Sequence, residues 1–247
     1  MIYLKSPAEI DIIRKNGVIL KECLETARDM VRVGVKKVDI DRTIEKLILK
    51  AGAKPAFKGF QGYPAATCIS VNDEVVHGMP NGRVLEEGDI CGIDIGVVKD
   101  GYYADAARTF PVGKVSAQAQ KLLEVTLESL ERGIGQARMG NRLSDISHVV
   151  ESYATENGFS VVKTLVGHGI GKRMHEEPQV PNFGPPSQGP KLEEGLVIAI
   201  EPMINVGKGD VFTKDDGWTV VTADNSLSAH FEDTVAITKD GPEILTR

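Results

Sequence analysis

Residues 85–105 read LEEGDICGIDIGVVKDGYYAD, and this stretch predicts the central hairpin of the fold. The pair Asp100-Gly101 is typical of a two-residue turn between antiparallel strands. Strands that pair across this turn place Asp94 opposite Ala107, with Asp105 on the same face one diagonal away, at roughly 7–8 Å between Cα atoms. Both carboxylates can then reach one site.

The surroundings of Asp94 are apolar, because its neighbours in the chain are Ile90, Cys91, Ile93, Ile95 and Val97. An unpaired carboxylate in such an interior strand is costly to ionise, and a bound cation removes that cost. The alternative is a surface hairpin that carries two solvated aspartates.

An internal repeat indicates two similar halves. Residues 85–88 and 192–195 are identical, and each segment is followed by an apolar run that ends in a carboxylate, Asp94 or Glu201. Residues 39–52 also align with residues 145–158. We expect one catalytic domain over residues 1–247, with halves of about 1–115 and 116–247 that place Asp94 and Glu201 across a pseudo-two-fold axis. A coincidental four-residue match is the alternative.

Helical periodicity and end signals predict four helices, of which the first follows the capping sequence Ser6-Pro7-Ala8-Glu9 and ends near Gly34. The others span about 39–51, 116–132 and 144–156. Together with the hairpin, they predict an α+β fold.

Composition bounds the function. Hydrophobic residues make up 41% and charged residues 26% of 247 residues, and the net charge is -6. Such a charge argues against direct recognition of nucleic acid. The 3 cysteines lack metal-type spacing, and neither a signal-length apolar run nor a run of about 18 apolar residues occurs. We expect a cytoplasmic protein without a membrane segment.

Three further side chains are candidate metal ligands. His168 lies between glycines, Glu201 ends an apolar run, and Glu232 lies in a strand of alternating polarity. Each alone has a simpler explanation, as a turn residue, an exposed acid or a polar sheet face. With Asp94 and Asp105 they form a set of mainly oxygen donors that suits Mn, Fe, Co or Zn. Two divalent ions about 3.5–4 Å apart would balance the four carboxylates and activate water for hydrolysis.

With these residues the chain resembles the type I methionine aminopeptidases of the pita-bread fold, over nearly its whole length. That fold has two pseudo-symmetric α/β halves, a central antiparallel sheet and flanking helices. The 25 residues between His175 and Glu201 leave no room for the insertion of type II members. The resemblance is carried by residues 62–64, 68–72, 77–80, 94–96, 105, 167–171, 175–178, 201–203 and 230–234.

The resemblance implies residue roles. Asp94, Asp105, His168, Glu201 and Glu232 would hold two metal ions, with Asp105 and Glu232 bridging them. Glu201 would carry the proton of the attacking water, His175 would contact the substrate carbonyl or its oxyanion, and His77 would contact the scissile amide. The methionine pocket would be lined by Phe57, Phe60, Tyr63, Cys68, His77, Met174, His175 and Trp218. Met174 departs from the family, which often has an aromatic residue at that position.

The resemblance also implies the substrate and the partners. Initiator methionine would be removed from nascent polypeptide N-termini when the second residue is small. The family is usually monomeric. Lys36, Lys37, Lys54 and Lys58 would offer a weak, transient contact with the ribosome, and the alternative is that they are solvated surface lysines. A monovalent cation near Asn72 and Ser228 is left open.

Two other functions stay open from the sequence. A Pro-specific peptidase or creatinase of the same fold would have a similar metal site, although such relatives usually carry an extra N-terminal domain. A non-catalytic peptide-binding module would keep the fold without metals, and the retention of five ligands and two histidines argues against it.

Overall fold

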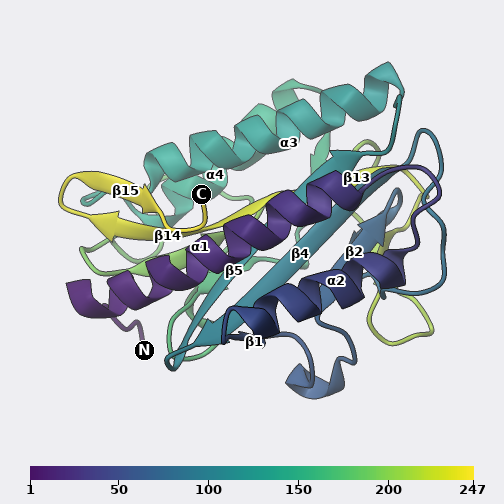
Figure 1. The fold of residues 1–247 in the computed structure, drawn as a ribbon. Helices are drawn as coiled ribbons and strands as arrows, with labels where there is room; N and C mark the ends of the chain where they lie inside the picture. The colour runs from purple at the N-terminus through teal and green to yellow at the C-terminus, as the bar shows by residue number, and fades with distance from the viewer.

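The computed structural model describes all residues 1–247, and its secondary structure alternates helix pairs with antiparallel strands. Four helices flank the sheet (Figure 1): α1 (Pro7–Met30), α2 (Lys37–Lys50), α3 (Ala117–Gln136) and α4 (Leu143–Glu156). A short 3-10 turn, η1, spans Phe60–Gly62. None of the helices combines the length and the apolar composition that a bilayer-spanning helix needs.

The main sheet has nine strands in the order β1-β4-β5-β14-β9-β7-β8, with β2 paired to β4 and β15 to β14. These strands are β1 (Lys54–Pro55), β2 (Thr67–Val71), β4 (Ile90–Lys99), β5 (Tyr102–Pro111), β7 (Gly167–Gly169), β8 (Glu176–Val180), β9 (Val197–Ile200), β14 (Glu232–Thr238) and β15 (Gly241–Ile244). Two three-stranded sheets, β13-β10-β6 and β11-β12-β3, complete the fold. Their strands are β3 (Glu74–Val76), β6 (Ser160–Val161), β10 (Met203–Asn205), β11 (Val211–Thr213), β12 (Val220–Thr222) and β13 (Ser228–His230).

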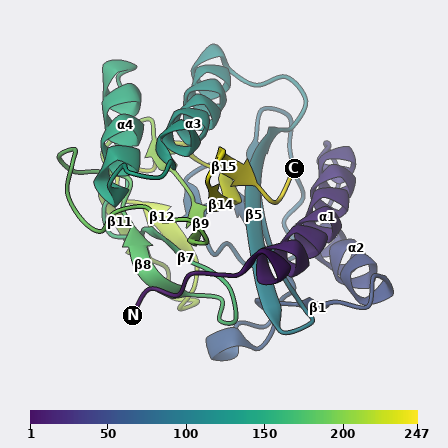
Figure 2. The same ribbon diagram turned by 90° about the vertical axis from the view of Figure 1, so that its left-hand side faces the viewer.

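The two helix pairs cover different parts of the sheet. Figure 2 shows α1 and α2 beside β5 at the right and α3 and α4 at the upper left, over another part of the sheet. One apolar core packs α1 and α2 against β2, β4 and β5, and a second packs α3 and α4 against β9 and β14. The strands therefore have one face buried under helices, and their other face is free to carry a site.

The central hairpin has the predicted register. Lys99 pairs with Tyr102, and Asp94 lies opposite Ala107. Because side chains alternate along a strand, Ile93 and its odd-numbered neighbours in β4 enter the core under α1 and α2. Asp94 in β4 and Asp105 in β5 consequently project from the opposite face.

Backbone pairing repeats between the two halves. An isolated antiparallel bridge joins Lys36 to Val84 just before α2, and a second joins Arg142 to Lys191 just before α4. These positions are equivalent in the repeat that the sequence predicts. The same backbone pairing thus leads into both helix pairs, as expected for pseudo-symmetric halves.

The third helix is longer than predicted. The sequence placed its end near Arg132, whereas α3 continues to Gln136 through Gly133 and Gly135. A Cβ on Gly133 would lie 3.0 Å from Cγ2 of Val150 in α4. Glycine at this position lets α3 and α4 approach closely, and their packing outweighs the low helix propensity of glycine.

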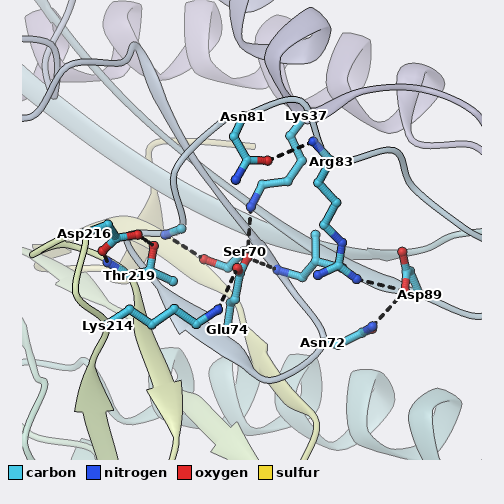
Figure 3. A network of polar contacts seen from close by, with 12 residues as sticks. Lys37, Ser70, Asn72, Glu74, Asn81, Arg83, Asp89, Lys214, Asp216 and Thr219 are labelled. Atoms are coloured by element: carbon cyan, nitrogen blue, oxygen red, sulfur yellow. Dashed lines mark hydrogen bonds and ion pairs between the residues drawn. The ribbon is translucent and has the colours of Figure 1, made fainter. Parts of the chain in front are cut away.

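Lys37 is buried, which corrects its predicted place among the surface lysines. Its side chain is 1% exposed, and its Nζ donates to Glu74 Oε2 at 2.9 Å. The backbone N of Val71 donates to the same oxygen, and Lys214 Nζ lies 3.3 Å from Oε1 (Figure 3). The lysine joins α2 to β3 and to the residues after β11, because an ammonium this deep must be paired.

We expect Lys37→Met to lower the free energy of unfolding by about 2 kcal/mol. Removing one partner of a buried ion pair costs about 3–5 kcal/mol, and Lys214 still offsets part of the charge on Glu74. Urea unfolding would measure the change. Arg42→Met is the matched control, because Arg42 forms an ion pair with Asp39 at 3.9 Å while 68% exposed, and its loss should change stability by less than about 0.5 kcal/mol. Equal effects of the two substitutions would contradict this account.

Candidate metal centre

Side chains from three strands meet on the free face of the sheet. Ligand atoms of Asp105 in β5, His168 in β7 and Glu232 in β14 all lie within 4.8 Å of one another. Asp94 and Glu201 line the same cavity. Glu201 follows β9 directly and lies close to the histidine, with Oε1 3.6 Å from His168 Nε2. The structure therefore brings the five sequence-predicted ligands to one place.

The donor set fits divalent cations. Asp94 Oδ1, Asp105 Oδ1 and Glu232 Oε1 are buried and have no hydrogen-bond partner. Buried polar atoms are normally satisfied, and unpaired carboxylate oxygens are especially costly. A metal centre needs several unpaired carboxylate oxygens close to an imidazole, and this cluster provides them. A site of oxygen donors with one nitrogen suits Mn, Fe, Co or Zn and differs from the thiolate ligands of a structural zinc site.

The electrostatics of the cluster support the same conclusion. Burial raises the pKa of Asp94, Glu201 and Glu232 well above ordinary values, and the neighbouring charge of Asp105 adds to each shift. Burial also raises the pKa of Asp105 to about 7 and lowers that of His168 to about 4. Anionic charge is unfavourable here without a cation, whereas a neutral imidazole is ready to act as a ligand.

His168 is oriented for coordination by its own backbone. Its Nδ1 lies 2.9 Å from the carbonyl oxygen of Gly169. A carbonyl can only accept, so Nδ1 must carry the proton and Nε2 keeps a free lone pair. The glycines around His168 are required by close packing, because a Cβ on Gly169 would lie 2.3 Å from the carbonyl oxygen of Glu177.

Two threonines join β5 to its neighbours, Thr234 from β14 and Thr109 toward His230 at the end of β13, and no sequence pattern singled out their bonds. Thr234 Oγ1 accepts from the backbone N of Asp105 at 3.1 Å and donates to its carbonyl oxygen at 2.8 Å. Thr109 Oγ1 makes the same two bonds with His230, at 3.0 and 2.7 Å. Each hydroxyl replaces a missing partner in the ladder, and together they set the position of the carboxylates on the two strands.

A second unpredicted contact set lies behind Glu232. Asp233 is fully buried and receives hydrogen bonds from Arg108 Nη2 at 2.6 Å, Arg247 Nη2 at 2.6 Å and Thr246 Oγ1 at 2.7 Å. Arg108 also donates to the backbone oxygen of Glu232. Because charge-assisted bonds are strong, this network immobilises the strand position that carries Glu232. The only sequence signal was an acidic pair in an apolar segment.

His230 is a further residue of the centre that the sequence left as part of a polar sheet face. Its Nε2 lies 3.7 Å from Glu201 Oε2 and has no hydrogen-bond partner. Burial lowers its pKa to about 3. A neutral imidazole at this position faces the carboxylate that lies next to His168.

An apolar pocket adjoins the cluster within one cavity of about 550 Å³. That volume suits a small ligand. Tyr63 and Trp218 meet edge to face with ring centroids 5.2 Å apart, and Phe60 packs against His175 at 5.3 Å. All the side chains predicted to bind substrate line this cavity, namely Phe57, Phe60, Tyr63, Cys68, His77, Met174, His175 and Trp218.

The two predicted catalytic histidines stand near the metal ligands. The imidazole of His175 lies edge-on to that of His168, with centroids 4.4 Å apart. Both residues keep an exposed edge, and partial desolvation in the cavity lowers the pKa of His175; the same desolvation, followed by the charge of the nearby His175, lowers the pKa of His77. His77 adopts a left-handed backbone conformation with φ of 57°, which a non-glycine residue rarely adopts and which is common at functional sites.

The predicted neighbours of a monovalent cation are adjacent. The backbone N of Ser228 donates to the carbonyl oxygen of Asn72 at 2.8 Å. Ser228 Oγ is buried without a partner, and Asn72 Oδ1 accepts from the backbone N of Ile90 at 3.0 Å. These residues lie at the start of β13 and in the turn after β2. A bound ion there stays a prediction.

The profile of metallopeptidase family M24 matches residues 11–239 of the chain. The chain belongs to this family. M24 members that resemble it include the methionine aminopeptidase of Clostridium perfringens, 55% identical over 100% of this chain and 99% of that protein. The methionine aminopeptidase 1 of Bacillus subtilis is 49% identical over the full length of both.

Solved structures of M24 relatives agree with the fold. The methionine aminopeptidase of Thermotoga maritima superposes with a TM-score of 0.99 at 44% identity and covers 100% of both chains. The prolidase of Pyrococcus furiosus superposes with a TM-score of 0.81 at 26% identity, and the match covers 65% of that longer chain. The predicted pita-bread fold and the predicted family are thereby confirmed, and M24 membership implies divalent metal binding.

Proposed function

We propose that this chain is a methionyl aminopeptidase, which removes the initiator methionine from polypeptides whose second residue is small. The observation that carries the proposal is the cluster of orphaned buried carboxylates beside an apolar, aromatic-lined pocket in one cavity. Aromatic rings and Met174 suit a polarizable thioether side chain. The similarity to methionine aminopeptidases over the full length supports the same substrate.

The five acidic and histidine side chains would hold two divalent ions. Bound there, the ions would lower the pKa of a water molecule and polarise the peptide carbonyl. Metal analysis of the purified protein identifies which of Co, Mn, Fe or Zn it carries. Asp94, Asp105, His168, Glu201 and Glu232 are the proposed ligands.

The remaining chemistry falls to three side chains. Glu201 would accept the proton of the attacking water and pass it to the leaving amine, as a general base and then a general acid. His175 would donate to the oxyanion that forms on the scissile carbonyl. His77, which lines the same cavity, would hold the scissile amide.

The peptides Met-Ala-Ser and Met-Lys-Ser test the proposed specificity. We expect purified, Mn-loaded protein to release methionine from the first peptide at least about 100-fold faster than from the second, because a narrow second subsite rejects a long side chain. Release of methionine is measured by chromatography. Leu-Ala-Ser is the control for the methionine pocket and should react slowly. Cleavage of neither methionyl peptide with any divalent ion would contradict the proposal.

A Pro-specific dipeptidase is the second candidate, favoured by the structural match to prolidase. That match leaves about a third of the prolidase chain uncovered, whereas the methionine aminopeptidases are covered in full. Met-Pro cleaved faster than Met-Ala-Ser would favour it. A metal-free binding module is disfavoured by the orphaned carboxylate oxygens.

The cellular setting follows the same proposal. The chain would act in the cytoplasm as a monomer of one catalytic domain, with halves of about 1–115 and 116–247, on nascent polypeptide N-termini. Of the lysines proposed for a ribosome contact, Lys58 forms an ion pair with Glu45, and Lys36 and Lys54 are exposed. Peptide N-termini are the partners that the site itself supports.

A further inference from the structure

A buried ion pair ties the segment before α1 to the loop that carries His175. Lys5 Nζ lies 2.8 Å from Glu176 Oε2, and both side chains are 4% exposed. The same ammonium donates to the carbonyl oxygen of Tyr3 at 3.0 Å. Lysine and glutamate are almost never buried to this degree unless they are paired.

The segment around Lys5 lies in a tight slot. The backbone N of Lys5 donates to the carbonyl oxygen of Gly195 at 2.7 Å. A Cβ on Gly195 would lie 2.6 Å from the carbonyl oxygen of Lys5, and one on Gly171 would lie 2.5 Å from Lys5 Cε. Figure 2 shows this first segment crossing from the side of β7 and β8 to the start of α1. The backbone of Lys5 and the stem of its side chain are therefore closely packed against Gly195 and Gly171.

Glu176 organises the loop that leads into β8. Its Oε1 accepts from the backbone N of Arg173 at 3.0 Å and so closes the turn before His175. One carboxylate therefore holds the loop through one oxygen and Lys5 through the other. His175 itself is exposed and is placed by this backbone and by its ring contacts with Phe60 and His168.

We propose that Lys5 is a positioning residue for the reaction, which acts through Glu176 to hold His175 and Met174 against the cavity. This inference rests on the proposed function, in which His175 contacts the oxyanion. Without Lys5, the carboxylate of Glu176 would lose its buried cation and turn toward solvent, and the turn at Arg173 would open. A displacement of about 1 Å at a catalytic group can cost on the order of 100-fold in rate.

Lys5→Met tests the proposal, because methionine keeps the unbranched apolar stem and removes the charge. With Met-Ala-Ser we expect kcat to fall about ten-fold while KM rises less than about three-fold and metal content stays unchanged. Lys15→Met is the matched control: Lys15 pairs with Asp11 at 2.7 Å in α1, and its side chain is 72% exposed. The control should keep kcat within about two-fold.

A double-mutant cycle separates positioning from general damage. If Lys5 acts through His175, Lys5→Met should cost nothing further in a His175→Ala background, where the group that it positions is absent. A full ten-fold loss in that background would overturn the proposal. So would a kcat of Lys5→Met equal to that of the unmodified chain.

The double variant Lys5→Met/Glu176→Gln separates the effect on activity from a general loss of stability. This variant removes both buried charges, and glutamine can still accept from the backbone N of Arg173, so the melting temperature should recover toward that of the unmodified chain. The kcat should stay about ten-fold low, because the loop before His175 is no longer joined to the segment before α1 through Lys5, even where the turn at Arg173 is kept. Recovery of kcat together with stability would show that the pair is structural only and would overturn the proposal.

A readout without substrate distinguishes this inference from the proposed function. Imidazole ¹⁵N NMR of metal-free protein reports on each of the 5 histidines. Lys5→Met should shift or broaden the His175 signals and leave those of exposed His148 unchanged, whether or not methionyl peptides are cleaved. Unchanged His175 signals would overturn the positioning role even if the enzyme proves to be a methionyl aminopeptidase.

Discussion

Glu201→Gln should lower kcat for Met-Ala-Ser by about 1,000-fold or more. General acid–base catalysis by one group contributes about 100- to 10,000-fold, and this substitution also removes an anionic metal donor. Glu201 is the proposed carrier of the proton, and its carboxylate lies 3.6 Å from His168 and 3.7 Å from His230. The amide keeps the shape of the side chain but cannot accept a proton.

The same substitution should not weaken the metal-free protein. Burial and the charge of Asp105 raise the pKa of Glu201 well above its usual range, so its carboxylate is unfavourable in the folded state without a cation. We expect the chelated variant to melt no lower than the chelated unmodified chain. Glu194→Gln, at an exposed position just before the same strand, is the activity control. A Glu201→Gln variant that keeps a tenth of the activity would refute the assigned role.

Metal removal should abolish activity, and restoring metal should raise the melting temperature by roughly 10 °C at neutral pH. This increase in melting temperature on adding metal should become smaller as pH falls from about 7.5 to about 5. Burial raises the pKa of Asp105 to about 7 and moves those of Asp94, Glu201 and Glu232 upward. Carboxyl groups with raised pKa hold protons at the lower pH that a cation must displace, so metal affinity is lost as pH falls through about 7.

The histidines do not change the direction of this pH dependence of metal binding. The pKa of His168 is lowered to about 4 and that of His230 to about 3, so both buried imidazoles are already neutral across this pH range. Scanning calorimetry of chelated protein with and without added Mn measures the increment. Glu232→Gln removes a proposed ligand and should shrink it at every pH. If the increase in melting temperature on adding Mn were independent of pH, protonation of the buried carboxylates would not control metal binding, and the prediction would be contradicted.

Local sequence was sufficient for the features that depend on neighbours in the chain. The turn at Asp100-Gly101 fixes the hairpin register, because side chains alternate with a period of two, and that register places Asp94 and Asp105 on one face. The capping box at Ser6 and Glu9 begins the first helix as predicted. Where packing between helices outweighs local propensity, as at Gly133, the prediction ended the helix too early.

Tertiary structure alone decided how the site is supported. Thr234 holds Asp105, Lys5 holds Glu176 and Lys37 holds Glu74, and these partners are 129, 171 and 37 residues apart in the chain. Each is a polar residue whose type fits many surface positions, so its pattern carries no sign of its partner. The sequence by itself predicted the candidate ligands and determined the hairpin and the helix pairs. Which side chains fix them in place was decided only by tertiary packing, because polar groups that become buried must find their partners within the fold.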